Sequence, residues 1–191
     1  MRTMATKKQT HAKTKKPPDE APEPRLKRTI FAEGHKRKLL VVVDETPECE
    51  SAVAFAASRV VRTHDQLALL YVIEPGAEFQ PWLGVEEFTR EEGHNKARAV
   101  FRLLGRKLKS MGLEDLEPEE IVREGIKAEE IIKLIEEDQD IGVLVLGASK
   151  DPSGPGELVS TLAGGRHAGT FPVPITVVPG HLSIEEILAL A

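Results

Sequence analysis

The stretch Leu39-Leu40-Val41-Val42-Val43-Asp44 decides the fold. Five consecutive apolar residues, three of them β-branched, predict a short strand that is buried on both faces, as in a parallel sheet. Thr46 and Pro47 follow after Glu45, and this pair predicts the start of a helix, with Thr46 as its cap and Pro47 in its first turn. A buried strand that runs straight into a helix is the opening unit of an α/β domain.

The same alternation continues along the chain. Apolar runs and helical spacing predict strands at 39–43, 67–73, 119–124, 141–146 and 173–178, with helices at 47–61, 85–111, 128–135 and 157–163 and a last short helix from Ser183. Strands separated by helices need right-handed crossovers, so we expect a mostly parallel five-stranded sheet with helices on both faces. The proline residues of the last strand place it at an edge of that sheet.

Composition limits the class of protein. The chain has 191 residues, 40% hydrophobic and 30% charged, which is enough for one packed domain and a tail. No apolar run approaches the roughly 18 to 20 residues that cross a bilayer, so we exclude membrane spanning. The single cysteine, Cys49, excludes an internal disulfide framework and a cluster of thiolate metal ligands, and it favours a reducing cytoplasm as the location.

Charge divides the chain into two parts. Residues 1–38 carry a net charge of +8, whereas the rest of the chain carries −13. Because binding to nucleic acid depends on neutralising phosphates, the acidic body is not expected to bind it. Residues 1–36 are rich in Lys, Thr and Pro without apolar periodicity, which predicts a disordered basic arm. Contact of this arm with nucleic acid or anionic lipid is the alternative interpretation.

Four groups of residues lie at or directly after the carboxyl ends of predicted strands. They are Asp44 with Glu45, residues 72–74, Gly125, and residues 147–150. The carboxyl ends of parallel strands meet at one edge of a sheet, and ligands bind there where the strand order reverses. We therefore expect these four groups to converge on one rim.

Several of these segments, in this order, resemble the universal stress protein family. The first strand runs through Val-Val-Val-Asp (41–44) into Thr-Pro, and the third unit reads Arg-Glu-Gly-Ile-Lys-Ala-Glu-Glu-Ile-Ile (123–132). The fourth strand ends in Val-Leu-Gly-Ala-Ser (145–149), and Phe-Pro-Val-Pro-Ile-Thr-Val-Val (171–178) closes the pattern. The resemblance implies a Rossmann-like, adenine nucleotide alpha hydrolase-like domain over 37–180. The short helix predicted from Ser183 then forms a C-terminal segment over 181–191.

The resemblance also implies how such a protein works. Members of the family form homodimers, which here would pair through the edge strand 173–178, and they act in stress adaptation without a strong catalytic activity. We therefore expect no enzyme, although slow ATP hydrolysis would be compatible with the family.

One loop bears on nucleotide binding. ATP-binding members of the family carry Gly, two residues, Gly, nine residues, and then Gly-Ser/Thr. Here Gly147 takes the first place, Lys150 replaces the second glycine with a cation, and Ser160 and Thr161 close the pattern. The resemblance implies a site for ATP or AMP, with or without Mg²⁺, in which Asp44 lies beside the adenosine and Val72 against the base. In the simpler interpretation the loop only joins strand to helix, and Asp44 caps the next helix through backbone amides.

Other chemistries fit less well. The sequence has no Walker loop and no nucleophile elbow, and its six histidines lack metal-ligand spacing. A phosphoacceptor receiver domain needs Asp at the end of the third strand and Lys at the end of the fifth, where this chain has Glu124-Gly125 and Pro179-Gly180. Two hypotheses remain: a nucleotide-binding stress regulator, and a nucleotide-independent dimeric module that contacts unknown protein partners through the loop around Trp82 and the basic arm.

Overall fold

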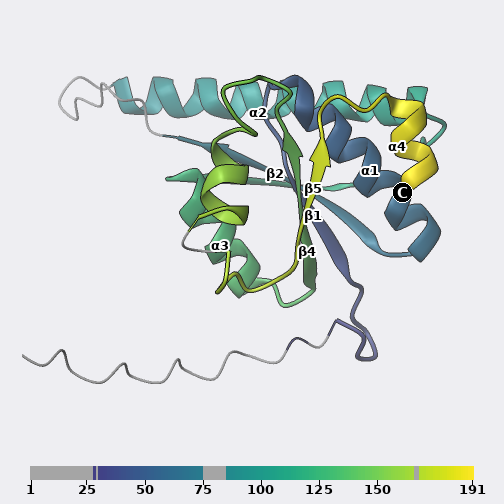
Figure 1. Ribbon diagram of the computed structural model, residues 1–191. Helices are drawn as coiled ribbons and strands as arrows, with labels where there is room; N and C mark the ends of the chain where they lie inside the picture. The colour runs from purple at the N-terminus through teal and green to yellow at the C-terminus, as the bar shows by residue number, and fades with distance from the viewer. Residues whose placement is uncertain (1–27, 29, 75–84, 166–167) are drawn as a thin grey trace, which may run out of the picture.

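Figure 1 shows the computed structural model of the chain, which describes residue 28 and residues 30–74, 85–165 and 168–191. The basic arm up to residue 27 and the loop around Trp82 lie outside the described residues. The elements in chain order are β1 (Lys38–Val42), α1 (Pro47–Thr63), β2 (Gln66–Ile73), α2 (Val85–Ser110), β3 (Glu119–Glu124), α3 (Lys127–Glu137), β4 (Ile141–Ala148), the π-helical turn η2 (Val159–Ala163), β5 (Ile175–Pro179) and α4 (Ile184–Leu190).

The five strands form one sheet in the order β3-β2-β1-β4-β5. Every neighbouring pair is parallel, which confirms the predicted α/β fold. In the centre, Val41 of β1 pairs with Leu69 of β2 on one side and with Val145 of β4 on the other. The chain winds away from β1 in both directions, so the strand order reverses between β1 and β4.

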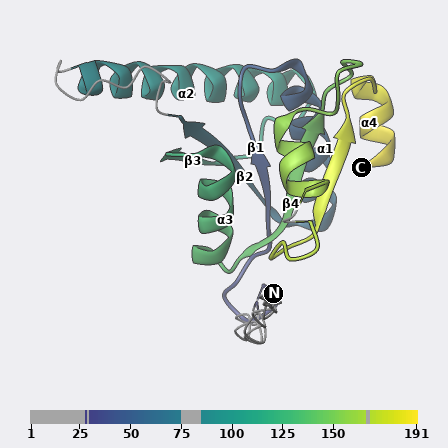
Figure 2. The same cartoon turned by 60° about the vertical axis from the view of Figure 1, so that its left-hand side comes forward.

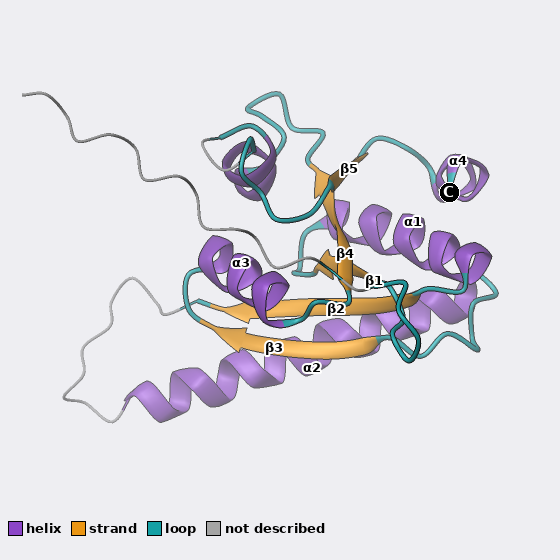
Figure 3. Cartoon of the chain, turned by 90° about the horizontal axis from the view of Figure 1, so that it is seen from below, coloured by secondary structure: helices purple, strands orange, loops and turns teal. Residues whose placement is uncertain are grey.

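Helices cover both faces of the sheet (Figure 2 and Figure 3). One core lies between the sheet and α1, α2 and α4, and it contains Val41, Phe101 and Ile187. The other core lies between the opposite face and α3 with η2, and it contains Leu40 and Ile135. Consecutive residues of β1 thus enter different cores, which is why that strand reads as a continuous apolar run rather than an alternating one.

The two edge strands differ in charge. β5 lies at an edge as predicted, and it begins at Ile175, two residues later than expected. It has no charged residue, and Val177 on it is 37% exposed. β3, at the opposite edge, is mostly charged, with Glu119, Glu120, Arg123 and Glu124. Charged edge strands resist pairing with further strands, so β5 is the edge better suited to extension of the sheet.

Side-chain capping differs between the starts of α4 and α1. At α4, Ser183 Oγ accepts a hydrogen bond from Glu186 N (3.3 Å), and Glu186 Oε2 accepts one from Ser183 N (2.8 Å), which is a capping box. At α1, Thr46 holds the cap position with Pro47 next to it, but its side chain makes no hydrogen bond to the helix. The predicted cap position of Thr46 is confirmed, but its hydroxyl donates to Asp44 instead of accepting a hydrogen bond from the helix.

Arg28 joins the N-terminal segment to the domain. Its guanidinium donates to the carbonyl oxygens of Ile135 (2.7 Å), Asp138 (3.2 Å) and Ile141 (2.8 Å). Carbonyls at the end of a helix lack intrahelical partners, and the arginine supplies donors for those at the end of α3. The packed part of the chain therefore starts before residue 37, the boundary that the sequence indicated.

Candidate functional site

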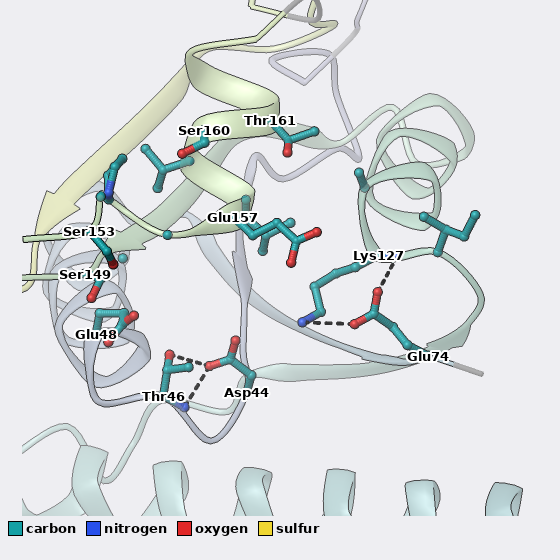
Figure 4. A pocket seen from close by; sticks show the side chains of 18 residues that line it. Asp44, Thr46, Glu48, Glu74, Lys127, Ser149, Ser153, Glu157, Ser160 and Thr161 are labelled. Carbon is teal, nitrogen blue, oxygen red and sulfur yellow. Dashed lines mark hydrogen bonds and ion pairs between the residues drawn. The ribbon is translucent and has the colours of Figure 1, made fainter. Parts of the chain in front are cut away.

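A cavity of about 720 Å³ opens at the carboxyl ends of β1 and β4, where the strand order reverses (Figure 4). Its wall includes Asp44 after β1, Gly147 of β4, and Ser160 and Thr161 of η2. The fold thus brings together four of the six predicted site residues from distant parts of the sequence. Ligand pockets in proteins occupy about 300–1,000 Å³, so this volume suits a molecule the size of a nucleotide.

The other two predicted residues lie outside that wall. Val72 of β2 is only 6% exposed and lines a smaller cavity of about 250 Å³. The two cavities share Asp44, Glu74 and Lys127, so a ligand that spans both would meet Val72. Lys150 is exposed and is not part of the wall of the large cavity.

Asp44 organises the bend between β1 and α1. Its Oδ1 accepts hydrogen bonds from the Thr46 backbone nitrogen (2.9 Å) and from Thr46 Oγ1 (2.5 Å). A carboxylate that accepts a hydrogen bond from the backbone nitrogen two residues later in the chain stabilises a tight turn. Because Thr46 occupies the cap position, these bonds do not cap α1 through its helical amides, as the simpler interpretation of Asp44 required. The turn holds the Asp44 side chain at the wall of the cavity.

Gly147 lies where the end of β4 meets the first turn of α1. A Cβ at this position would come within 2.6 Å of the Glu48 carbonyl carbon and closer still to the carbonyl oxygen. Real Cβ atoms essentially never approach other atoms within 3.0 Å. Packing alone therefore requires glycine here, whether or not the cavity binds a phosphate.

The loop between β4 and η2 is held together by its own side chains. Ser149 Oγ accepts a hydrogen bond from Asp151 N (3.2 Å), and Asp151 Oδ1 accepts one from Ser153 N (2.8 Å). The hydrogen bonds from Ser153 lower the pKa of Asp151. Gly154 and Gly156 adopt φ angles of 144° and 96°, which favour glycine, and both line the cavity. The loop therefore has a defined backbone shape next to the site.

Carboxylates outnumber cations in the wall of the cavity. The acidic residues are Asp44, Glu48, Glu74 and Glu157, and Lys127 is the one cation among the described residues that line it. Lys127 Nζ lies 3.4 Å from Glu74 Oε2, and the Lys127 backbone nitrogen donates to Glu74 Oε1, also at 3.4 Å. Figure 4 shows the Lys127 side chain extended toward the middle of the cavity. An entering polyphosphate would meet more negative than positive charge.

Sequence reasoning did not single out Lys127. It is the first residue of α3 and lies three positions after the end of β3 at Glu124. The rule that placed Gly125 at the rim therefore also places Lys127 there. Counting charges in the segments that follow each strand would have found it.

The site offers hydroxyl groups, backbone and one lysine rather than a metal centre. Within the described ranges, no group of three or more His, Cys, Asp or Glu is arranged to hold a metal ion. Cys49 is buried in the first turn of α1, and burial raises the pKa of its thiol to about 12, so it is not a nucleophile near neutral pH.

None of the described helices combines the length and apolar character that a bilayer crossing requires.

Comparison with known proteins gives a consistent result. The model of the universal stress protein family matches residues 36–179. Universal stress protein UspA from Lactobacillus plantarum is 20% identical, with a TM-score of 0.60, and the match covers 75% of this chain and 97% of that one. No curated protein sequence matches the chain.

Two further solved structures carry a ligand in their names. A universal stress protein in complex with cAMP is 17% identical, with a TM-score of 0.51 over 75% of this chain and 97% of that one. The universal stress protein from Archaeoglobus fulgidus in complex with dAMP is 14% identical, with a TM-score of 0.51 over 74% and 97%. At these identities, the likeness to the solved structures shows a shared fold.

Proposed function

The chain belongs to the universal stress protein family, and we propose that it is a cytoplasmic stress-response regulator that binds an adenine nucleotide in the cavity beside β1 and β4. The observation that carries the proposal is the meeting of Asp44, Gly147, Ser160 and Thr161 in one wall of a cavity of about 720 Å³. Solved structures of the same fold in complex with cAMP and with dAMP support it. We assign no reaction to the site.

Each part of the nucleotide has a proposed partner. The Asp44 carboxylate accepts hydrogen bonds from the ribose, and the base lies against Val72 in the smaller cavity. The hydroxyl groups of Ser160 and Thr161 donate to phosphate oxygens, and the glycine-rich backbone at 154–156 lets the phosphate approach closely. Mg²⁺, if it enters, would arrive with the phosphates of the ligand, because the described residues hold no metal cluster of their own.

Calorimetric titration with AMP and with ATP, in the presence and absence of Mg²⁺, tests this function. We expect binding in the micromolar range, weakened about tenfold by the double substitution Ser160→Ala and Thr161→Val, which removes two hydroxyl donors. Ser110→Ala, at the far end of α2, is the matched control and should bind like the unmodified protein. Absence of heat with every nucleotide would refute the proposal and favour a nucleotide-independent interaction module.

We also propose that two copies pair through β5. This strand is an uncharged sheet edge, and a symmetry-related copy would satisfy its free backbone groups. Val177→Lys on β5 should give a monomer in light scattering at tens of micromolar, whereas Val61→Lys on α1, at a similarly exposed valine, should leave the dimer intact. A monomeric unmodified protein at that concentration would contradict the pairing.

A further inference from the structure

Among the described residues of its wall, the cavity offers a phosphate one cation, and that cation does not come from the loop after β4. Lys127 supplies the single positive charge among the described residues of the wall, while Lys150 is exposed and outside it. We propose that Lys127 binds the phosphate of the nucleotide, that Glu74 competes with the phosphate for Lys127, and that the site selects a nucleoside monophosphate over a triphosphate. This inference rests on the proposed function, since it names the ligand class and the contacts of the same site.

The contact between Lys127 and Glu74 is loose enough to exchange. Its length of 3.4 Å exceeds the roughly 2.7–2.9 Å of a charge-assisted hydrogen bond. The Glu74 side chain is 51% exposed, so it can turn into solvent at little cost, and ion pairs this exposed contribute little to stability. The Lys127 side chain is only 25% exposed and therefore stays within the cavity. A phosphate carries more negative charge than a carboxylate and would take its place.

The remaining carboxylates set the limit on ligand charge. Asp44, Glu48 and Glu157 stay in the wall after Glu74 is displaced, and no second lysine or arginine in the described wall balances them. One phosphate group carries between one and two negative charges near neutral pH, which Lys127 can largely offset. Each additional phosphate brings uncompensated negative charge to an acidic wall. The triphosphate is thus repelled unless a divalent cation screens it.

The experiment compares adenosine, AMP and ATP by calorimetry at low salt with a chelator present. In the unmodified protein, we expect AMP to bind at least tenfold more tightly than adenosine and more tightly than ATP. Lys127→Gln should lower the affinity for AMP about tenfold, which is the effect of losing one charged hydrogen bond, and should change the affinity for adenosine less than twofold.

Three further variants make the test specific. Glu74→Gln keeps an acceptor for the α3 backbone but removes the competing charge, so it should raise the affinity for AMP severalfold. Lys133→Gln removes the same charge from the same helix outside the cavity, where Lys133 pairs with Glu130, and it should bind AMP like the unmodified protein. Lys150→Gln should weaken AMP binding less than Lys127→Gln does.

The outcomes separate this inference from the proposed function. If Lys127→Gln binds AMP as tightly as the unmodified protein does, or if ATP without Mg²⁺ binds more tightly than AMP, the inference fails while nucleotide binding stands. A larger loss in Lys150→Gln than in Lys127→Gln would assign the phosphate to the loop and also overturn it. If the unmodified protein binds none of the three ligands, both proposals fail.

Discussion

The substitution Gly147→Ala tests how the cavity is built. The added methyl group would lie 2.6 Å from the Glu48 carbonyl carbon, and the two nearest atoms belong to backbone rather than to a flexible side chain. Relief requires the first turn of α1 to move away from β4 by several tenths of an ångström or more. Overpacking costs about 1–3 kcal/mol, and a backbone neighbour places this position at the upper end, so we expect a loss of about 3 kcal/mol. In a chain of this length that lowers the melting temperature by about 6–12 °C.

Gly105→Ala is the matched control, since it makes the same chemical change in the middle of α2. A Cβ at Gly105 meets nothing within 4 Å, and alanine favours the helix by about 1 kcal/mol, so this variant should melt about 2–4 °C higher. Thermal and urea unfolding, followed by circular dichroism, measure both. If Gly147→Ala is as stable as the unmodified protein, the close packing of β4 against α1 is not what requires glycine. The result also matters for binding assays. A protein with any larger residue at position 147 would bind nucleotide less tightly because its fold is disturbed, even if Gly147 does not contact the ligand.

Three other expectations concern single groups. Cys49 should resist thiol reagents at pH 8 in the folded protein and react fully in urea, because a pKa of about 12 leaves roughly one thiolate in ten thousand; fast reaction of the native protein would contradict its burial. Arg28→Ala should lower the free energy of unfolding by about 1–2 kcal/mol in urea titrations, and Arg28→Lys should not restore it, because one ammonium cannot serve three carbonyls. The lowered pKa of Asp151 means that its contribution to stability is present above its unfolded pKa and is lost as pH falls through the folded value. Asp151→Asn should therefore flatten the acid limb of the stability profile, and an unchanged limb would refute the role of Ser153.

Much of the fold could be predicted from the sequence because its central strands are buried on both faces. The runs at 39–43 and 141–146 cannot be amphipathic helices, and prolines beside the last strand mark an edge. The details that could not be predicted depend on which of several possible hydrogen-bond partners a side chain takes. Thr46 looks like a helix cap, yet Asp44, two residues earlier, offers its hydroxyl a charged acceptor.

The candidate site was predictable to the same degree. Rim positions follow from topology, so Asp44 and Gly147 could be placed near each other before the structure was known, whereas Ser160 and Thr161 were implied by the resemblance to the family's loop. The direction of a side chain in a loop does not follow from topology, and Lys150 lies in a segment folded by the hydrogen bonds of Ser149 and Asp151. Lys127 was overlooked because it reads as part of a helical pattern rather than as a rim residue.

The contrast between the two margins of the sheet governs how far association can proceed. If two copies join through β5, both outer borders of the combined sheet are β3, where most residues are charged. Such borders repel another strand, so growth by edge-to-edge addition stops at two subunits instead of continuing into a fibre. Replacing the acids of β3 with valine or threonine would remove that stop, and turbidity or filament formation would then be the expected consequence.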